Sequence, residues 1–110
     1  TSKACQTAVR LLQRKIEKPV TGFYFMEILS STDWAFPNGG QNFIPNTFIE
    51  IGKEGLKKKI ESLSIYKGVM RDYPHPRSIE ALSGSAAFRG GQAGLFYAEA
   101  FQAAYQCNII

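Results

Sequence analysis

The stretch Thr47-Phe48-Ile49-Glu50-Ile51 and the pattern behind it decide the fold class of this 110-residue chain. Its β-branched and aromatic residues are typical of a short strand. Beyond Lys53, apolar residues recur at the spacing of one helical face, namely Leu56, Ile60, Leu63, Tyr66 (or Lys67) and Met70. Together with the helices and strands predicted on either side, this strand and helix indicate an α/β or α+β protein, and we take α/β as the prediction.

The regions on either side of this unit supply further elements. Residues 2–16 predict an amphipathic helix, which Pro19 stops, and residues 23–29 predict a well-buried strand that is apolar on both sides except at Glu27. Ser78 is a good N-cap for a third helix, which Gly90-Gly91 are expected to end. Residues 94–105 fit a strand or a helix. The sequence thus predicts three helices and two or three strands, too few for a self-contained parallel sheet.

Composition limits the classes of protein to which the chain can belong. Its length fits one domain, and no apolar run approaches the ~20 residues of a membrane-spanning helix. The net charge of +4 comes largely from lysines placed away from an apolar helical stripe, so we expect a solvated face and no nucleic-acid partner. Cys5 and Cys107 are expected to be two free, partly buried thiols in a reducing cytoplasm, with a disulfide as the alternative.

Residues 30–42 are rich in turn-forming residues and predict a loop longer than the usual ~4–6 residues. Trp34 and Phe36 lie within it. Packing of the loop onto the body of the protein is the favoured interpretation of these two aromatic residues, and the alternative is that they line a pocket.

The sequence does not offer a complete catalytic centre. A zinc enzyme needs about three protein ligands, whereas the chain has one histidine and no ligand pair at metal-binding spacing. It also lacks a Gly-x-Ser-x-Gly nucleophile motif, and Gly90-Gly91-x-x-Gly94 lacks the lysine of a phosphate-binding loop. We therefore assign neither catalytic residues nor metal ligands within this chain.

The histidine lies in the segment Tyr73-Pro74-His75-Pro76-Arg77-Ser78. The flanking prolines predict a stiff, extended backbone, on which His75 and Arg77 point the same way. A guanidinium there can clamp a carboxylate or phosphate, and an imidazole beside it can donate to a sugar hydroxyl or an oxyanion. The alternative is a structural ion pair of Arg77 with Glu80 or Glu99.

An ordered set of motifs gives the chain a family resemblance. The longer ones are Tyr24-Phe25-Met26-Glu27-Ile28-Leu29-Ser30-Ser31-Thr32-Asp33-Trp34, Phe43-Ile44-Pro45-Asn46-Thr47-Phe48-Ile49-Glu50-Ile51 and Lys57-Lys58-Lys59-Ile60-Glu61-Ser62-Leu63, and the shorter ones are Tyr66-Lys67, His75-Pro76-Arg77-Ser78, Arg89-Gly90 and Ala98-Glu99-Ala100-Phe101. In this order and over nearly the whole length, the chain resembles the C-terminal half of the PIG-L/LmbE-like family of zinc-dependent N-acetylglucosaminyl deacetylases.

The resemblance implies hydrolysis of the acetamide of an N-acetylated amino-sugar conjugate, with zinc in the complete enzyme. It also implies that residues 1–110 are the C-terminal portion of one deacetylase domain, inactive alone, whose strands add to a Rossmann-like, mostly parallel sheet in a three-layer fold. The family's zinc ligands and base lie in N-terminal motifs that this chain lacks. His75 and Arg77 match the family stretch and are implied to shape the substrate side of the pocket or a subunit contact, in a monomer or a homo-oligomer. Tyr73 lies where some members place an oxyanion-stabilising tyrosine.

Two other functions compete with this one. A non-catalytic sugar or sugar-nucleotide binding module would use Arg77 and the loop that carries Trp34. A basic nucleic-acid binder rests on the net charge alone and lacks a recognised module.

Overall fold

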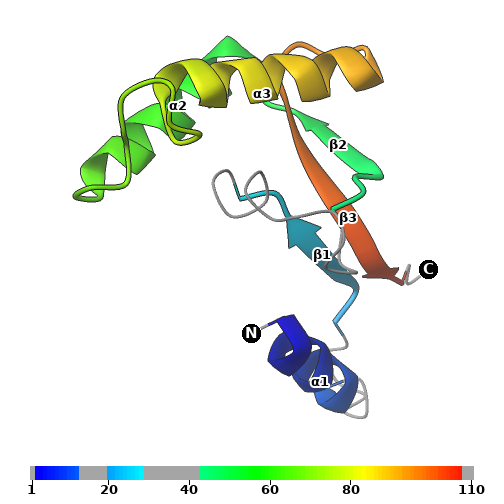
Figure 1. Ribbon diagram of the computed structural model, residues 1–110. Helices are drawn as coiled ribbons and strands as arrows, with labels where there is room; N and C mark the ends of the chain where they lie inside the picture. The colour runs from blue at the N-terminus through cyan, green and yellow to red at the C-terminus, as the bar shows by residue number, and fades with distance from the viewer. Residues whose placement is uncertain (1, 13–19, 29–42, 108–110) are drawn as a thin grey trace.

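The computed structural model describes residues 2–12, 20–28 and 43–107, which form three helices and three strands. Helix α1 spans Ser2–Leu12, strand β1 Gly22–Met26 and strand β2 Thr47–Glu50, after which helix α2 spans Gly52–Ile65. Helix α3 spans Ile79–Ala93, and strand β3 spans Ala98–Gln106 (Figure 1). Helices and strands in one unit confirm the general α/β class.

The three strands form one sheet in the order β1-β3-β2. Both pairings are antiparallel, and Phe101 of β3 is opposite Met26 on one side and Thr47 on the other. The segment 94–105, which fitted either element, is therefore mostly a strand, and it is the central one. The described strands contain no parallel pair, so a mostly parallel sheet is not present in this part of the chain.

Helix α2 begins where predicted but is shorter than its apolar pattern. It starts at Gly52, which has a positive φ of 65°, with Ile51 as the one residue between it and β2. It ends at Ile65, because Tyr66 is extended and Gly68 has a φ of 77° in the turn that follows. Tyr66 and Met70 therefore lie beyond the helix, although their spacing continues its apolar face.

Helix α3 has the predicted start and a later end. The Oγ atom of Ser78 accepts a hydrogen bond from the backbone N–H of Ala81 at 3.1 Å, which confirms the N-cap. The helix continues through Gly90-Gly91 to Ala93, and Gly94 caps it in the left-handed conformation with φ 71°. The prediction that Gly90-Gly91 end the helix was wrong because Gly90 serves packing. A Cβ atom added there would lie 2.6 Å from the carbonyl oxygen of Leu95.

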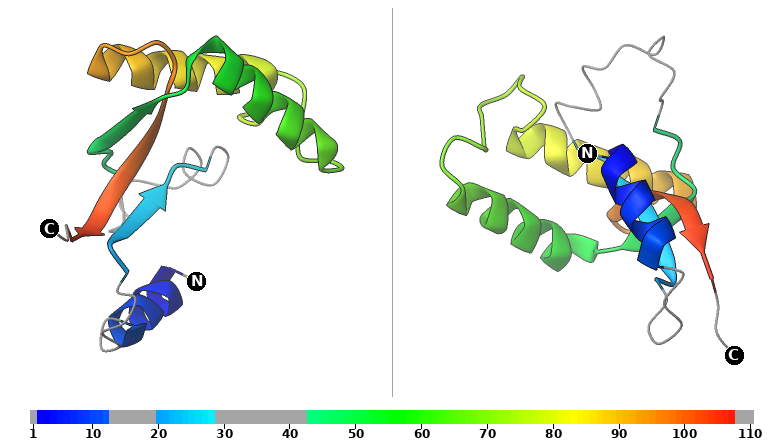
Figure 2. Two further views of the ribbon diagram at one scale, coloured as in Figure 1. Left: turned by 180° about the vertical axis from the view of Figure 1, so that it is seen from behind. Right: turned by 90° about the horizontal axis from the view of Figure 1, so that it is seen from below.

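The buried apolar side chains of the described residues lie where α3 packs on β3 and β2 and beside α2. They are Leu56, Leu82, Ala86, Ala98 and Ala100. Figures 1 and 2 show α2 and α3 at one end of the strands and α1 at the other, where β1 begins and β3 ends. The described helices include none with the length and apolar character needed to cross a bilayer.

Strand β1 was predicted to be well buried, and the structure corrects this. Phe23 and Phe25 are half-buried, whereas Tyr24 and Met26 are exposed, Met26 by 62%. The described elements cover only one side of a strand that is apolar on both. Both cysteines are free, with Cys5 exposed and Cys107 half-buried, so Cys5 is more accessible than predicted.

Candidate functional site

The predicted site segment forms a closed turn between α2 and α3. The backbone N–H of His75 donates to the carbonyl oxygen of Asp72 at 3.0 Å, and that of Ser78 donates to the carbonyl oxygen of His75 at 3.0 Å. The N–H of Arg71 donates to the carbonyl oxygen of Arg77 at 3.1 Å, which joins the two ends of the segment. The prediction of an extended arm was therefore wrong, since these backbone bonds fold the segment into consecutive turns.

His75 contacts the backbone of its own turn. Its Nδ1 atom accepts a hydrogen bond from the backbone N–H of Arg77 at 3.0 Å. Partial burial, with the positive charges of Arg77 and Arg71, lowers the pKa of the His75 imidazole below its ordinary 6.5. Both effects favour the neutral ring, because an acceptor nitrogen carries no proton. The proton of the neutral tautomer is then on Nε2, which makes that atom a donor at neutral pH.

Arg77 is the residue of this turn with an unmet hydrogen-bonding requirement. Its backbone is held on both sides, by the His75 ring and by the N–H of Arg71. Its Nε atom is buried and has no hydrogen-bond partner among the described residues. A buried donor without an acceptor costs about 1–3 kcal/mol, more for a charged group, so such an atom requires an explanation.

The structural alternative for Arg77 was an ion pair with Glu80 or Glu99. Among the described residues neither pair forms, and Glu99 instead pairs with Lys59 of α2. Tyr73 shares the turn with His75 and Arg77, with its side chain 68% exposed. The structure thus brings the three predicted residues into one turn and places His75 and Arg77 in direct contact.

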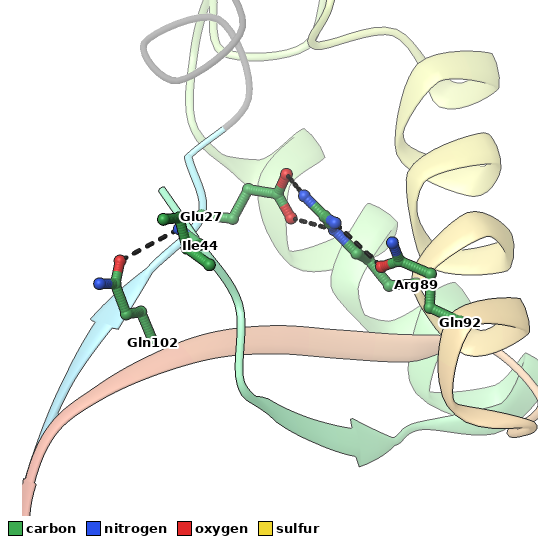
Figure 3. Close-up of polar contacts among 5 residues, drawn as sticks. All are labelled: Glu27, Ile44, Arg89, Gln92 and Gln102. Atoms are coloured by element: carbon green, nitrogen blue, oxygen red, sulfur yellow. Dashed lines mark hydrogen bonds and ion pairs between the residues drawn. The ribbon is translucent and has the colours of Figure 1, made fainter. Parts of the chain in front are cut away.

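A second group of polar side chains lies between β1 and α3, and the sequence did not predict it as a site. Glu27, one residue beyond β1, accepts two hydrogen bonds from Arg89 of α3, from Nε at 3.1 Å and from Nη2 at 2.8 Å (Figure 3). The remaining Nη1 atom of Arg89 donates to Gln92 at 3.0 Å. The guanidinium carbon also lies 5.8 Å from the ring centroid of Phe43 and 5.5 Å from that of Phe88.

This ion pair borders a small polar cavity of about 10 Å³. Its lining includes both ion pairs and a serine, namely Glu27, Arg89, Lys59, Glu99 and Ser85. Such a volume holds about one water molecule, too little for a sugar or a nucleotide. Each carboxylate here is paired with a cation, so neither is available as a general base. The arrangement therefore connects elements of the fold and does not form a substrate pocket.

A sequence signal for this pair did exist. Glu27 is the one charged residue in the apolar segment 23–29, and a charge in such a place is expected to have a partner. Arg89 is on the face of α3 that approaches β1, but only the tertiary structure shows that it is the partner.

A cluster of metal-binding side chains is absent from the residues that the structure describes. In residues 2–12, 20–28 and 43–107, the structure does not bring three His, Cys, Asp or Glu side chains together. They do not fit the zinc ion that the family resemblance implies, and we derive no chemistry through it from these residues. Trp34 and Phe36, expected to pack the loop or line a pocket, lie outside the described residues.

Comparison with protein-family models, with curated proteins and with solved structures finds no match to this chain. The resemblance to the deacetylase family therefore rests on the ordered motifs of the sequence and stays a prediction. The turn that carries His75 and Arg77 is the strongest candidate site, because it combines a neutral imidazole with a buried cationic donor that has no acceptor among the residues that the structure describes.

Proposed function

We propose that this chain is the C-terminal part of a zinc-dependent deacetylase domain that hydrolyses the acetamide of an N-acetylglucosamine-type conjugate. In this proposal the zinc ion is held by an N-terminal part of the same domain, and the present residues contribute to the substrate side. The motif order carries the family assignment. The observation that carries the structural part is the uncovered apolar surface of the described elements.

Exposed large apolar side chains outnumber the buried apolar ones among the described residues. The described residues bury five apolar side chains, three of them alanines, while thirteen large apolar side chains are exposed. Large exposed apolar patches mark surfaces that contact other polypeptide or a ligand. If the sheet of the domain continues into a further polypeptide segment, the residues described here would expose the apolar side chains that this segment covers.

The finer fold is part of the same proposal. Among the described strands, β1 and β2 are the edges of the sheet, and an edge strand presents unpaired backbone groups. A Rossmann-like sheet in the N-terminal part would pair with one of these edges. The antiparallel strands described here would then extend a mostly parallel sheet within a three-layer fold.

The role proposed for the Tyr73–Ser78 turn follows from its donors. Arg77 offers a guanidinium whose buried Nε has no acceptor among the described residues, and His75 offers a neutral ring with its proton on Nε2. The acetamide oxygen gains negative charge during hydrolysis, and hydroxyl and carbonyl groups of the sugar conjugate accept hydrogen bonds. We assign Arg77 to holding the conjugate and His75 to donating to its oxygens, with Tyr73 at the exposed edge of the same turn.

The decisive experiment compares the chain printed above with a longer polypeptide extended at its N-terminus. Both are purified, their zinc content is measured, and release of acetate from an N-acetylglucosamine conjugate is followed. We expect zinc and activity in the extended polypeptide and neither in the 110-residue chain. Tight zinc binding by the 110-residue chain, or an extended polypeptide without deacetylase activity, would refute the proposal.

The role of Arg77 has a matched control in the same turn. In the extended polypeptide, Arg77→Gln is expected to lower kcat/KM by about 10–100-fold, the equivalent of one charge-assisted hydrogen bond of about 1.5–3 kcal/mol. Arg71→Gln removes an equal charge from an exposed side chain whose Nε donates to the carbonyl oxygen of Gly68, and should lower kcat/KM much less, because Arg71 contributes less than burial and Arg77 to the pKa of His75. Equal effects of the two changes would show that net charge, and not the position of Arg77, matters.

A further inference from the structure

The turn from Tyr73 to Ser78 brings two positive charges together. Arg77 lies within the turn, and Arg71 is joined to it by the hydrogen bond from its backbone N–H to the carbonyl oxygen of Arg77. Both guanidinium charges act on the His75 ring, which accepts the Arg77 N–H through Nδ1. Because the ring itself is neutral, the positive charge of this turn comes from the two arginines.

The described residues do not pair these charges with carboxylates. Among them, no carboxylate forms an ion pair with either arginine. Asp72 and Glu80 are near the turn in sequence, yet the charges that act on the His75 ring are those of Arg77 and Arg71. The two positive charges are therefore not paired within the part of the chain that the structure describes.

Arg77 is also partly withdrawn from water. Its side chain is half-buried, and its Nε atom is buried without a hydrogen-bond partner among the described residues. A cation that loses its hydration water is stable only when an anion or hydrogen-bond acceptors replace that water. An anion from outside the described residues is therefore the expected partner of Arg77.

Charge favours a phosphate monoester as this anion. A phosphate monoester carries a charge of about −1.5 to −2 at pH 7 and has three acceptor oxygens, which matches two guanidinium groups. A carboxylate or a phosphodiester carries a single negative charge and would neutralise only one of them. The planar fork of N–H donors on a guanidinium also fits two phosphate oxygens at once.

We propose that this turn binds a phosphate monoester group on the amino-sugar conjugate, with Arg77 in direct contact with the phosphate oxygens and Arg71 as a second positive charge nearby. The sugar part of this inference rests on the function proposed above, whereas the phosphate part rests on the turn. The inference narrows the substrate to a phosphorylated N-acetylated amino sugar.

The single histidine of the chain makes this binding measurable by NMR. In the chain printed above, prepared with isotope-labelled histidine, the Cε1–H signal of His75 reports on the turn. The chain is titrated with N-acetylglucosamine 1-phosphate at constant ionic strength and about pH 7.5, where the ring is neutral and the phosphate is mostly doubly charged. We expect a saturable shift of the signal with this sugar phosphate and none with N-acetylglucosamine.

Three substitutions test the assignment of the phosphate to Arg77. Arg77→Gln should weaken binding about 10–100-fold, the effect of losing one charge-assisted hydrogen bond. Arg71→Gln should weaken it less, by several-fold. Lys67→Gln is the matched control, because it removes an equal charge from an exposed side chain of the same connection, and it should leave the affinity nearly unchanged. The His75 signal without ligand shows whether each variant keeps the folded turn.

Four results would overturn the proposal: no saturable shift, an equal response to acetate, inorganic phosphate binding as tightly as the sugar phosphate, or equal losses for Arg77→Gln and Lys67→Gln. These readouts involve neither zinc nor deacetylation. Phosphate binding by the turn in a polypeptide without deacetylase activity would refute the proposed function alone. Deacetylase activity of the extended polypeptide without phosphate binding would refute this inference alone.

Discussion

The two ends of the sheet differ in how completely they are packed. At the α3 end, Leu82, Ala86, Ala98 and Ala100 are buried together, and Ser78 caps the helix with its side chain fully enclosed. At the α1 end, Leu11 of α1 and Tyr105, which pairs with Phe23 near the start of β1, are exposed although both side chains are largely apolar. The comparison shows that helices and strands form at both ends. The described contacts, however, do not include a segment that covers the apolar side chains at the α1 end.

The Glu27–Arg89 ion pair ties the far end of β1, the strand that begins at the α1 end, to α3 at the packed end, because Glu27 follows the last residue of β1. Its side chains are 12% and 15% exposed, respectively, so water screens the pair only partly. The Lys59–Glu99 pair joins α2 to β3 and is more exposed, at 34% and 27%. A substitution at Glu27 therefore tests the contact between β1 and α3, and a substitution at Lys59 separately tests the contact between α2 and β3.

The largest effect is expected from breaking that connection. Glu27→Ala leaves the Arg89 guanidinium without its carboxylate, and removing one partner of a largely buried pair costs about 2–4 kcal/mol. Urea unfolding should show this loss of free energy, whereas Lys59→Ala, at the more exposed pair, should cost under about 1 kcal/mol. Equal losses for the two variants would mean that Glu27 does not join the ends more strongly than Lys59 does.

A smaller loss of stability is expected from a substitution at Gly90, at the packed end. A Cβ atom at Gly90 would lie 2.6 Å from the Leu95 carbonyl oxygen and 2.9 Å from the Tyr97 nitrogen, and both are backbone atoms that cannot rotate away. Gly90→Ala should therefore destabilise the protein by about 1–3 kcal/mol in urea unfolding. Gly91→Ala is the control, because a Cβ atom there meets nothing within 4 Å, and it should be neutral or stabilising by about 0.5–1 kcal/mol. Similar losses for both variants would contradict the close approach of the chain at Gly90.

The sequence predicted much of the local structure and little of its assembly. The N-cap at Ser78, the strand at residues 47–51 and the start of α2 follow from residue types at fixed spacing, which are local signals. The end of α3 was mispredicted because two glycines typically mark a helix end, whereas Gly90 is required by a contact with residues beyond the helix.

The candidate site shows the same division. The sequence singled out His75 and Arg77 from residue chemistry, and the structure places them in contact, but the prolines that suggested an extended arm lie in a closed turn. The partner of Glu27 and the exposure of one side of β1 depend on contacts across 62 residues of sequence and on the covering of a face. Periodicity shows that a residue is apolar and does not show what covers it.

The smallest change in stability is expected from a change of pH, which acts through the single histidine at the packed end. Because the folded-state pKa of His75 is below 6.5, the unfolded chain takes up a proton at a higher pH than the folded protein does. The contribution of this group to stability is therefore complete above the unfolded pKa and is lost as pH falls through 6.5 toward the lower folded value. We expect the unfolding free energy measured in urea to decline slightly over that window, and His75→Asn to flatten the decline. A stability that rises as pH falls from 7 to 5.5 only when His75 is present would show that the imidazole gains a proton on folding, which would contradict its role as the neutral acceptor of the Arg77 N–H.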